Sequence, residues 1–211
     1  KLMLENGKHV LCEKPMALSK VEAVELYELA SRKNLVLMEA VKTAYCPGFN
    51  ELINIAKSGK IGRIVDVEAT FTRLTPTNTR EYTNPIYNGS FLEFGTYGLL
   101  PILKLLGTDY TSVSFKSLRN IGGVDTYTKA FIEYNNAMAT VKTGLGAKSE
   151  GQLVVTGTNG YILAKSPWWM TKTFQVRFED ANRIEEYNYP YEGTGLQYEL
   201  AIFLVAILDK N

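Results

Sequence analysis

The chain has 211 residues, of which 45% are hydrophobic and 21% charged, and its formal net charge at pH 7 is +1. This balance is ordinary for a soluble globular protein and excludes a mainly disordered chain. It also excludes the strong single-sign field that binding to nucleic acid or to an anionic membrane requires. No apolar run approaches the ~18 residues of a membrane span and no secretory signal is visible, so we expect a cytoplasmic protein.

The first forty residues have the pattern of a strand, a helix and a second strand. Residues 8–13 are an extended run that ends before Pro15, because the residue before a proline favours extended geometry. Ser19 with Glu22 three residues later predicts a capped helix that continues to about Lys33. Residues 35–41 are apolar enough for a buried strand. We therefore expect two parallel strands with a right-handed crossover.

The pattern from Pro47 onward is that of an α+β domain. A helix is predicted at 47–57, a long alternating strand at 64–74, a polar loop at 75–90 and an apolar helix at 91–106. Strand-like runs follow at 111–119, 127–134, 138–145, 151–157, 161–166, 173–179 and 183–188. An amphipathic helix is predicted to begin near Thr194 and to pass Leu208. The predicted fold is an α/β unit followed by an α+β domain with a large, mostly antiparallel open sheet.

Three residues are candidates for chemistry. Lys14 follows the first strand, where open α/β sheets bind ligands, and an ammonium there can neutralise an oxyanion or lower the pKa of a hydroxyl. Glu93 and Tyr97 stand four residues apart and share a helix face in an apolar segment. Structural interpretations stay open: a solvated lysine, a local bridge by Glu93 and a packed tyrosine. The single histidine and two cysteines predict neither a nucleophile pair nor a metal site.

Four segments together resemble a known family. They are G-K-H-V-L-C-E-K-P-M-A (7–17), S-G-K-I-G-R-I (58–64), N-G-S-F-L-E-F-G-T-Y (88–97) and G-T-N-G-Y-I (157–162). Their order and spacing are similar to those of the glucose–fructose oxidoreductase / inositol dehydrogenase / rhizopine catabolism (Gfo/Idh/MocA) family. The resemblance implies that residues 1–44 are the C-terminal part of a dinucleotide-binding Rossmann domain and residues 45–211 a substrate-binding and dimerisation domain. On this basis we expect a whole enzyme of the family to have about eighty further residues before this sequence.

The resemblance also implies a function. It is that of an oxidoreductase that uses NAD or NADP to move a hydride to or from a sugar, polyol or related cyclic alcohol or ketone. Glu13, Lys14 and Pro15 would line the nicotinamide ring. Glu93 takes the place of the family's aspartate, and Tyr97 that of its histidine, as in the dihydrodiol dehydrogenase branch. There the tyrosine is the acid/base and the lysine assists it.

Two features of the sequence leave alternatives open. Lys42 and Ala44 replace a tryptophan and an arginine of that branch, and no Gly-x-Gly-x-x-Gly turn is present to hold the pyrophosphate. The chain alone is therefore expected to bind NAD(P) poorly. The other readings are a non-catalytic module for substrate recognition and dimerisation, and an NAD-dependent glycoside hydrolase of the same family. In each case we expect a homo-oligomer formed through the open sheet face and no metal.

Overall fold

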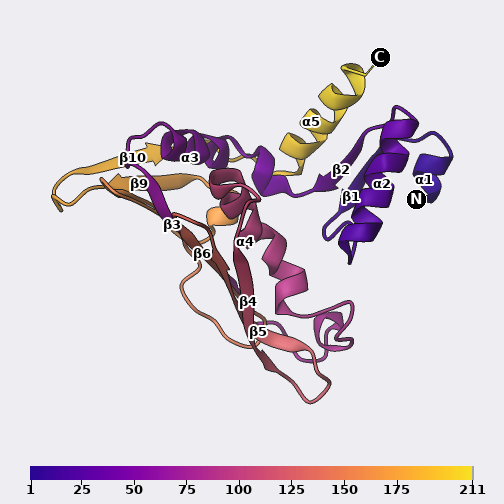
Figure 1. Cartoon of the computed structure of the whole chain (residues 1–211), viewed down its shortest axis with the longest axis horizontal. Helices are drawn as coiled ribbons and strands as arrows, with labels where there is room; N and C mark the ends of the chain where they lie inside the picture. Colours follow the sequence, from indigo (N-terminus) through magenta and orange to yellow (C-terminus); the bar gives the residue numbers. More distant parts are fainter. Residues whose placement is uncertain (211) are drawn as a thin grey trace. The chain divides into compact units, whose positions relative to one another are not determined.

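The computed structural model describes residues 1–210, which form two compact units (Figure 1). Unit 1 comprises Lys1–Tyr45 together with the segment from Glu192 onward, and unit 2 comprises Cys46–Tyr191. The predicted boundary between residues 44 and 45 lies one residue from this division. The closing helix differs from the prediction, which placed it in the second domain, because the structure assigns it to unit 1.

Unit 1 contains the predicted parallel strand pair. Strands β1 (Val10–Glu13) and β2 (Leu37–Ala40) pair in parallel, with Val10 opposite Leu37 and Glu13 opposite Ala40. Helix α2 (Lys20–Arg32) connects them, and the Ser19 side chain caps it by accepting a hydrogen bond from the Glu22 N–H. The short helix α1 (Leu2–Glu5) packs on α2. A small apolar core of Leu4, Ala30 and Leu35 holds these elements together.

The closing helix α5 (Leu196–Leu208) packs against the 3₁₀ turn η1 (Lys42–Tyr45) of unit 1. The Lys42 ammonium donates to the Thr194 carbonyl at 3.1 Å, and the Lys210 ammonium to the Leu35 carbonyl at 3.2 Å. The expected amphipathic pattern is absent, since the large apolar side chains of α5 are half-exposed while Glu199 is buried. A helix that is apolar on all sides does not indicate which unit it joins.

Unit 2 is built on an eight-stranded sheet in the order β10-β9-β8-β7-β3-β6-β5-β4. The strands are β3 (Ile64–Thr72), β4 (Ser112–Arg119), β5 (Asp125–Glu133), β6 (Met138–Gly144), β7 (Leu153–Gly157), β8 (Tyr161–Ala164), β9 (Thr173–Arg177) and β10 (Ile184–Asn188). All neighbours are antiparallel except β3 and β6, which are parallel. The predicted fold class is therefore confirmed, a small Rossmann-like unit followed by a large, mostly antiparallel sheet.

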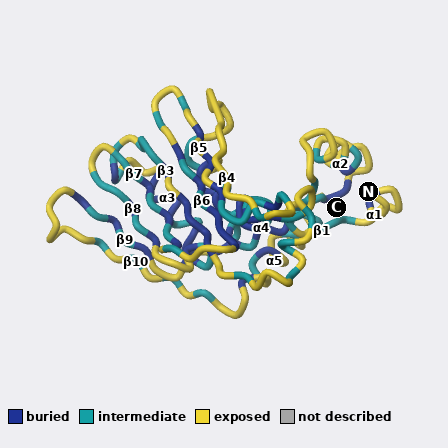
Figure 2. Tube along the Cα trace, turned by 90° about the horizontal axis from the view of Figure 1, so that it is seen from below, coloured by how far each residue is buried: buried dark blue, intermediate teal, exposed yellow. Residues whose placement is uncertain are grey.

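Helix α4 (Ser90–Leu106) covers one face of this sheet, where it packs on β3, β5 and β6. Its Gly98 lies so close to β6 that an added Cβ would stand 2.5 Å from Val141 Cγ1. Helix α3 (Pro47–Lys57) packs beside α4 and against the 3₁₀ turn η3 (Trp168–Met170). Figure 2 shows the buried residues gathered in the central strands β3 and β6. Within residues 1–210, no helix combines the length and apolar character that crossing a bilayer requires.

Candidate functional site

The turn after β1 carries the first group of predicted site residues. Glu13 ends β1 and is exposed, Lys14 is half-buried, and the bond between Lys14 and Pro15 is cis. The Met16 N–H donates to Glu39 Oε1 at 2.9 Å, which ties the turn to the neighbouring strand β2. Lys14 is therefore presented at the carboxyl end of a parallel strand pair, the edge at which such sheets bind ligands.

Helix α4 of unit 2 carries the second group. Glu93 and Tyr97 are one turn apart and both are half-buried. The Glu93 N–H donates to the Gly89 carbonyl at 3.0 Å, so Glu93 belongs to the first turn of the helix. The Tyr97 ring lies 5.3 Å from the Phe71 ring, centroid to centroid, with the two planes tilted by 50°. The structure thus brings Glu93 and Tyr97 to one side of α4, beside the end of β3.

An aromatic cluster surrounds Tyr97. The Phe71 ring stacks between Trp169, at a centroid distance of 3.6 Å, and Phe94, at 4.3 Å. Tyr82 packs against the same cluster. Phe71 and Phe94 are buried, whereas Tyr82, Tyr97 and Trp169 are half-buried. Half-buried aromatic rings can bind the apolar side of a ring-shaped ligand. Sequence reasoning did not single out Phe71, because its partners come from α4 and η3.

The polar loop that precedes α4 is anchored at the edge of this cluster. The Arg73 guanidinium lies 5.5 Å from the centre of the Phe94 ring and 4.0 Å from the Glu81 carboxylate. Glu81 lies in the short turn η2 (Arg80–Tyr82). A hydrogen bond from the Thr79 side chain and the positive charges of Arg80 and Arg73 hold the pKa of Glu81 below its usual value. The loop therefore presents a carboxylate and guanidinium groups beside the aromatic cluster.

A buried carboxyl in unit 1 escaped the sequence analysis. Glu199 on α5 is only 3% exposed, and its Oε2 has no hydrogen-bond partner among the described residues. Burial and the nearby Glu13 raise the pKa of Glu199, while Lys42 opposes the increase. An orphaned acceptor close to Glu13 suits a ligand that supplies an N–H or O–H donor, such as a nicotinamide carboxamide. The residues at this end of unit 1 therefore fit the cofactor that the sequence implies.

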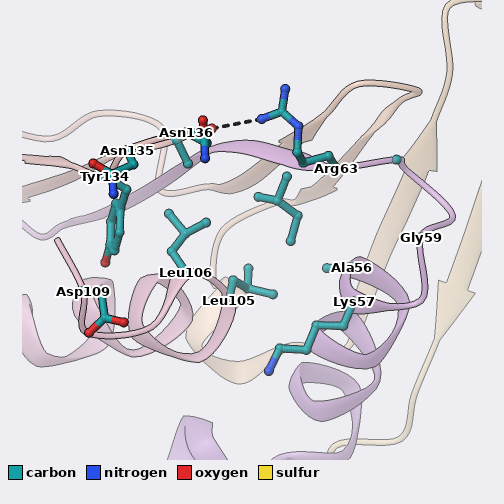
Figure 3. A pocket seen from close by; sticks show the side chains of 13 residues that line it. Ala56, Lys57, Gly59, Arg63, Leu105, Leu106, Asp109, Tyr134, Asn135 and Asn136 are labelled. Carbon is teal, nitrogen blue, oxygen red and sulfur yellow. Dashed lines mark hydrogen bonds between the residues drawn. The ribbon is translucent and has the colours of Figure 1, made fainter.

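One pocket of unit 2 lies away from these residues. It has a volume of about 460 Å³, and Figure 3 shows it between the ends of α3 and α4 and the β5–β6 turn. Leu105 and Leu106 line its apolar side, and Arg63, which donates to the Asn136 carbonyl at 3.0 Å, stands at its rim. None of the predicted site residues lines it. In the described part of the chain, no group of His, Cys, Asp or Glu is placed to hold a metal ion.

Comparisons with known proteins match both units. Residues 1–41 match the oxidoreductase family with an NAD-binding Rossmann fold, and residues 49–163 match the GFO/IDH/MocA C-terminal domain. A trans-1,2-dihydrobenzene-1,2-diol dehydrogenase of Xenopus laevis is 27% identical over 94% of this chain and 62% of its own length. A scyllo-inositol 2-dehydrogenase (NADP(+)) of Bacillus subtilis is 27% identical over 100% of this chain and 65% of its own length. The chain thus spans less than two thirds of these relatives.

Solved structures show the same fold. A 3-ketoreductase from Actinomadura kijaniata, in complex with NADP and TDP-benzene, superposes with a TM-score of 0.83 at 22% identity, over 99% of this chain and 65% of the other. A levoglucosan dehydrogenase in its apo form gives a TM-score of 0.82 at 21% identity, over 99% and 67%. The resemblance seen in the motifs is confirmed, because the C-terminal domain match alone covers more than half of the sequence. The chain belongs to the Gfo/Idh/MocA family of oxidoreductases.

Proposed function

We propose that the protein is an NAD(P)-dependent oxidoreductase that acts on a sugar, a polyol or a related cyclic alcohol or ketone. Membership of the family and the names of the relatives support this reaction class. The observation that carries the proposal is the position of Tyr97, one helical turn after Glu93 and beside a cluster of stacked aromatic rings. Oxidation of a cyclic alcohol requires a group that accepts the hydroxyl proton, and reduction of the ketone requires a group that donates one. A tyrosine hydroxyl beside a surface for a ring-shaped ligand can do both.

Unit 1 supplies the residues that would hold the cofactor. Glu13, Lys14 and Pro15 follow β1, and Glu199 offers an unpartnered acceptor near Glu13. When bound, the nicotinamide ring accepts or gives the hydride. These side chains orient the ring and exclude water from one side of it, so that the reacting carbon of the substrate meets it in one geometry.

The Tyr97 hydroxyl is proposed to exchange a proton with the substrate hydroxyl. A phenol has an ordinary pKa of about 10, so it exchanges protons near neutral pH only when a cation stabilises the phenolate. Lys14 is proposed as that cation. Glu93 carries a carboxylate on the same side of α4 as Tyr97 and is proposed to orient a second substrate hydroxyl.

Steady-state kinetics of the full-length protein test this proposal. NADH or NADPH formation is measured with a panel of cyclitols, pyranoses and cyclic diols. We expect Tyr97→Phe and Lys14→Ala each to lower kcat by about 10²–10⁴-fold. Tyr134→Phe is the matched control, because its hydroxyl only donates to the Gly107 carbonyl at 3.0 Å. Full activity in both site variants would refute the assignment, and glycoside cleavage without net NAD(P)H formation would show the hydrolase instead.

We also propose that the protein forms a homo-oligomer through the open face of the sheet. On that face Lys116, Lys129 and Lys142 stand directly opposite one another across β4, β5 and β6. The neighbouring strand β3 carries Asp66 and Glu68 on the same face. A second copy related by a two-fold axis can set lysines against carboxylates. Sedimentation equilibrium should show a dimer that Lys142→Glu weakens, whereas a monomer at all concentrations would refute this proposal.

A further inference from the structure

We propose that Asp125 is a positioning residue, which by capping helix α4 from strand β5 sets the orientation of Glu93 and Tyr97. The inference rests on the proposed function of that pair. Asp125 is the first residue of β5, and it is 35 residues from its partner Ser90 in the sequence. No motif in the chain connects the two.

The Asp125 carboxylate accepts three hydrogen bonds on one oxygen. Its Oδ2 lies 2.6 Å from Ser90 Oγ, 3.0 Å from the Phe91 backbone nitrogen and 2.8 Å from Thr128 Oγ1. Ser90 Oγ also lies 2.9 Å from Thr143 Oγ1 of β6. The three hydroxyl-bearing residues are at most 2% exposed and Asp125 is half-buried, so the hydroxyl groups of this network are shielded from water. The network therefore joins the first turn of α4 to two strands.

Helix α4 needs this cap because it has none of its own. The residue before it is Gly89, which has no side chain to accept from the first N–H groups. Asp125 provides the missing acceptor and places a negative charge at the positive end of the helix dipole. Gly89 has φ 132°, and a Cβ there would stand 2.0 Å from Asp125 Oδ1. Glycine at this position thus allows the carboxylate its close approach.

The cap acts on the proposed site through the helix. Glu93 donates its N–H to the Gly89 carbonyl at 3.0 Å, so it sits in the turn that Asp125 fixes. Tyr97 is one turn further, immediately before Gly98, where α4 touches Val141 of β6. Glu93 and Tyr97 therefore lie between two points at which the helix is attached to the sheet. A shift of about 1 Å at a reacting group can cost about 10²-fold in rate.

Kinetics of the full-length protein separate positioning from stability. We expect Asp125→Ala to lower kcat by about 10²-fold with little change in the KM for NAD(P)H, and Asp125→Asn, which keeps one acceptor oxygen, to recover part of the loss. Tyr134→Phe is the control, because it removes a hydrogen bond at the opposite end of α4. Unchanged kcat in Asp125→Ala, or equal losses of kcat in Asp125→Ala and Tyr134→Phe, would overturn the inference.

A second measurement does not depend on activity. With 3-fluorotyrosine at position 97, the ¹⁹F resonance reports the surroundings of that ring. Asp125→Ala should shift or broaden it, whereas Tyr134→Phe should leave it in place. If Asp125→Ala fails to fold, Ser90→Ala removes one of the three donors and serves instead. An unchanged ¹⁹F resonance overturns the inference, while a shifted resonance in a protein without turnover upholds it and refutes the proposed function alone.

Discussion

The two faces of the eight-stranded sheet differ in the polarity of their side chains. The row under the helices is apolar across seven strands: Val176, Ile162, Val155, Val67, Ala139, Ile132 and Val113. The adjacent row on the open face is mixed: Glu186, Gln175, Leu163, Val154, Glu68, Thr140, Phe131 and Ser114. Because side chains alternate along each strand, one sequence supplies both rows.

The two faces are therefore expected to have different roles, one in packing and one in association. The covered face is closely packed, and it fixes α4 with its pair Glu93 and Tyr97. The open face carries charges and half-exposed apolar residues that its own chain leaves without cover, such as Phe131 at 40% exposure. Stability and the orientation of the site are therefore expected to depend on the first face, and association on the second.

Replacing phenylalanine on either face is expected to give the largest contrast. Phe71 is 9% exposed and stacks on two rings, so Phe71→Ala should lower the free energy of unfolding by about 3–5 kcal/mol. Phe131→Ala on the open face should cost under about 1 kcal/mol at concentrations where the protein is monomeric. Urea unfolding measures both. Equal losses would show that the two faces contribute alike.

The contact between α4 and the sheet gives the next largest effect. Gly98→Ala places a methyl group 2.5 Å from Val141 Cγ1, and this overpacking should cost about 1–3 kcal/mol. Adding Val141→Ala removes the obstructing methyls, so the double variant should lose less than the sum of the two single variants. Gly122→Ala, where the nearest atom is Asn120 Oδ1 at 3.4 Å, is the control. Strict additivity would contradict the close contact.

The alternation of apolar and polar residues was enough to predict the strands of the sheet, but it could not predict their order in the sheet. Alternation places a strand at 161–166, and the structure has Tyr161–Ala164, because period-two burial is a property of neighbouring residues. The parallel pairing of β3 with β6 depends on residues far apart in the chain. The same limit hid the location of α5, whose apolar residues surround the helix.

The residues of the candidate site also fall into those that local sequence could indicate and those that it could not. Lys14, Glu93 and Tyr97 could be proposed from the sequence because each stands in a motif with a position relative to a helix or strand, and their roles stay predictions. Phe71 and Asp125 were not found, because the partners that give them a role lie on other elements. Asp125 stands at the start of a strand and Phe71 near the end of one. Nothing in the residues next to them in the sequence distinguishes them from other strand residues.

The acidic pair on the open face predicts a pH-dependent stability. Burial and the neighbouring Glu68 raise the pKa of Asp66 from 3.8 to about 6. The folded state therefore holds a proton that the unfolded state has lost, so this contribution to stability is present below pH 3.8 and is lost as the pH rises to about 6. The shift corresponds to at most about 3 kcal/mol, and partial exposure to solvent reduces this to about 1–2 kcal/mol.

Thermal and urea unfolding between pH 4 and pH 8 measure this effect. Asp66→Asn should stabilise the protein by about 1–2 kcal/mol at pH 7.5 and have almost no effect at pH 4. Glu68→Gln should give part of the same gain, because it removes the neighbouring negative charge. A stabilisation by Asp66→Asn that is the same at both pH values would rule out this titration.

Lys116, Lys129 and Lys142 form a row across β4, β5 and β6 that we call the lysine ladder. Replacing a lysine of this ladder is expected to change stability least, and it also tests whether the open face mediates assembly. Lys129 stands directly opposite both Lys116 and Lys142. Burial and, to a smaller extent, the charge of Lys129 lower the pKa of Lys142, while the charge of Glu68 opposes this decrease. Lys129→Thr should therefore stabilise the monomer by about 0.2–1 kcal/mol, and less at high salt, where charges are screened. Lys165→Thr, an exposed lysine outside the ladder, should have no such effect.

The same substitution tests what the ladder is for. If the lysines meet carboxylates of a second copy, Lys129→Thr should stabilise the monomer and at the same time weaken the dimer, with both changes shrinking as salt is added. Sedimentation equilibrium at two salt concentrations measures the second change. A stabilised monomer with unchanged association would mean that the repulsion between the lysines destabilises the monomer and that these lysines do not contribute to the dimer. The two faces would then differ in their effect on stability alone.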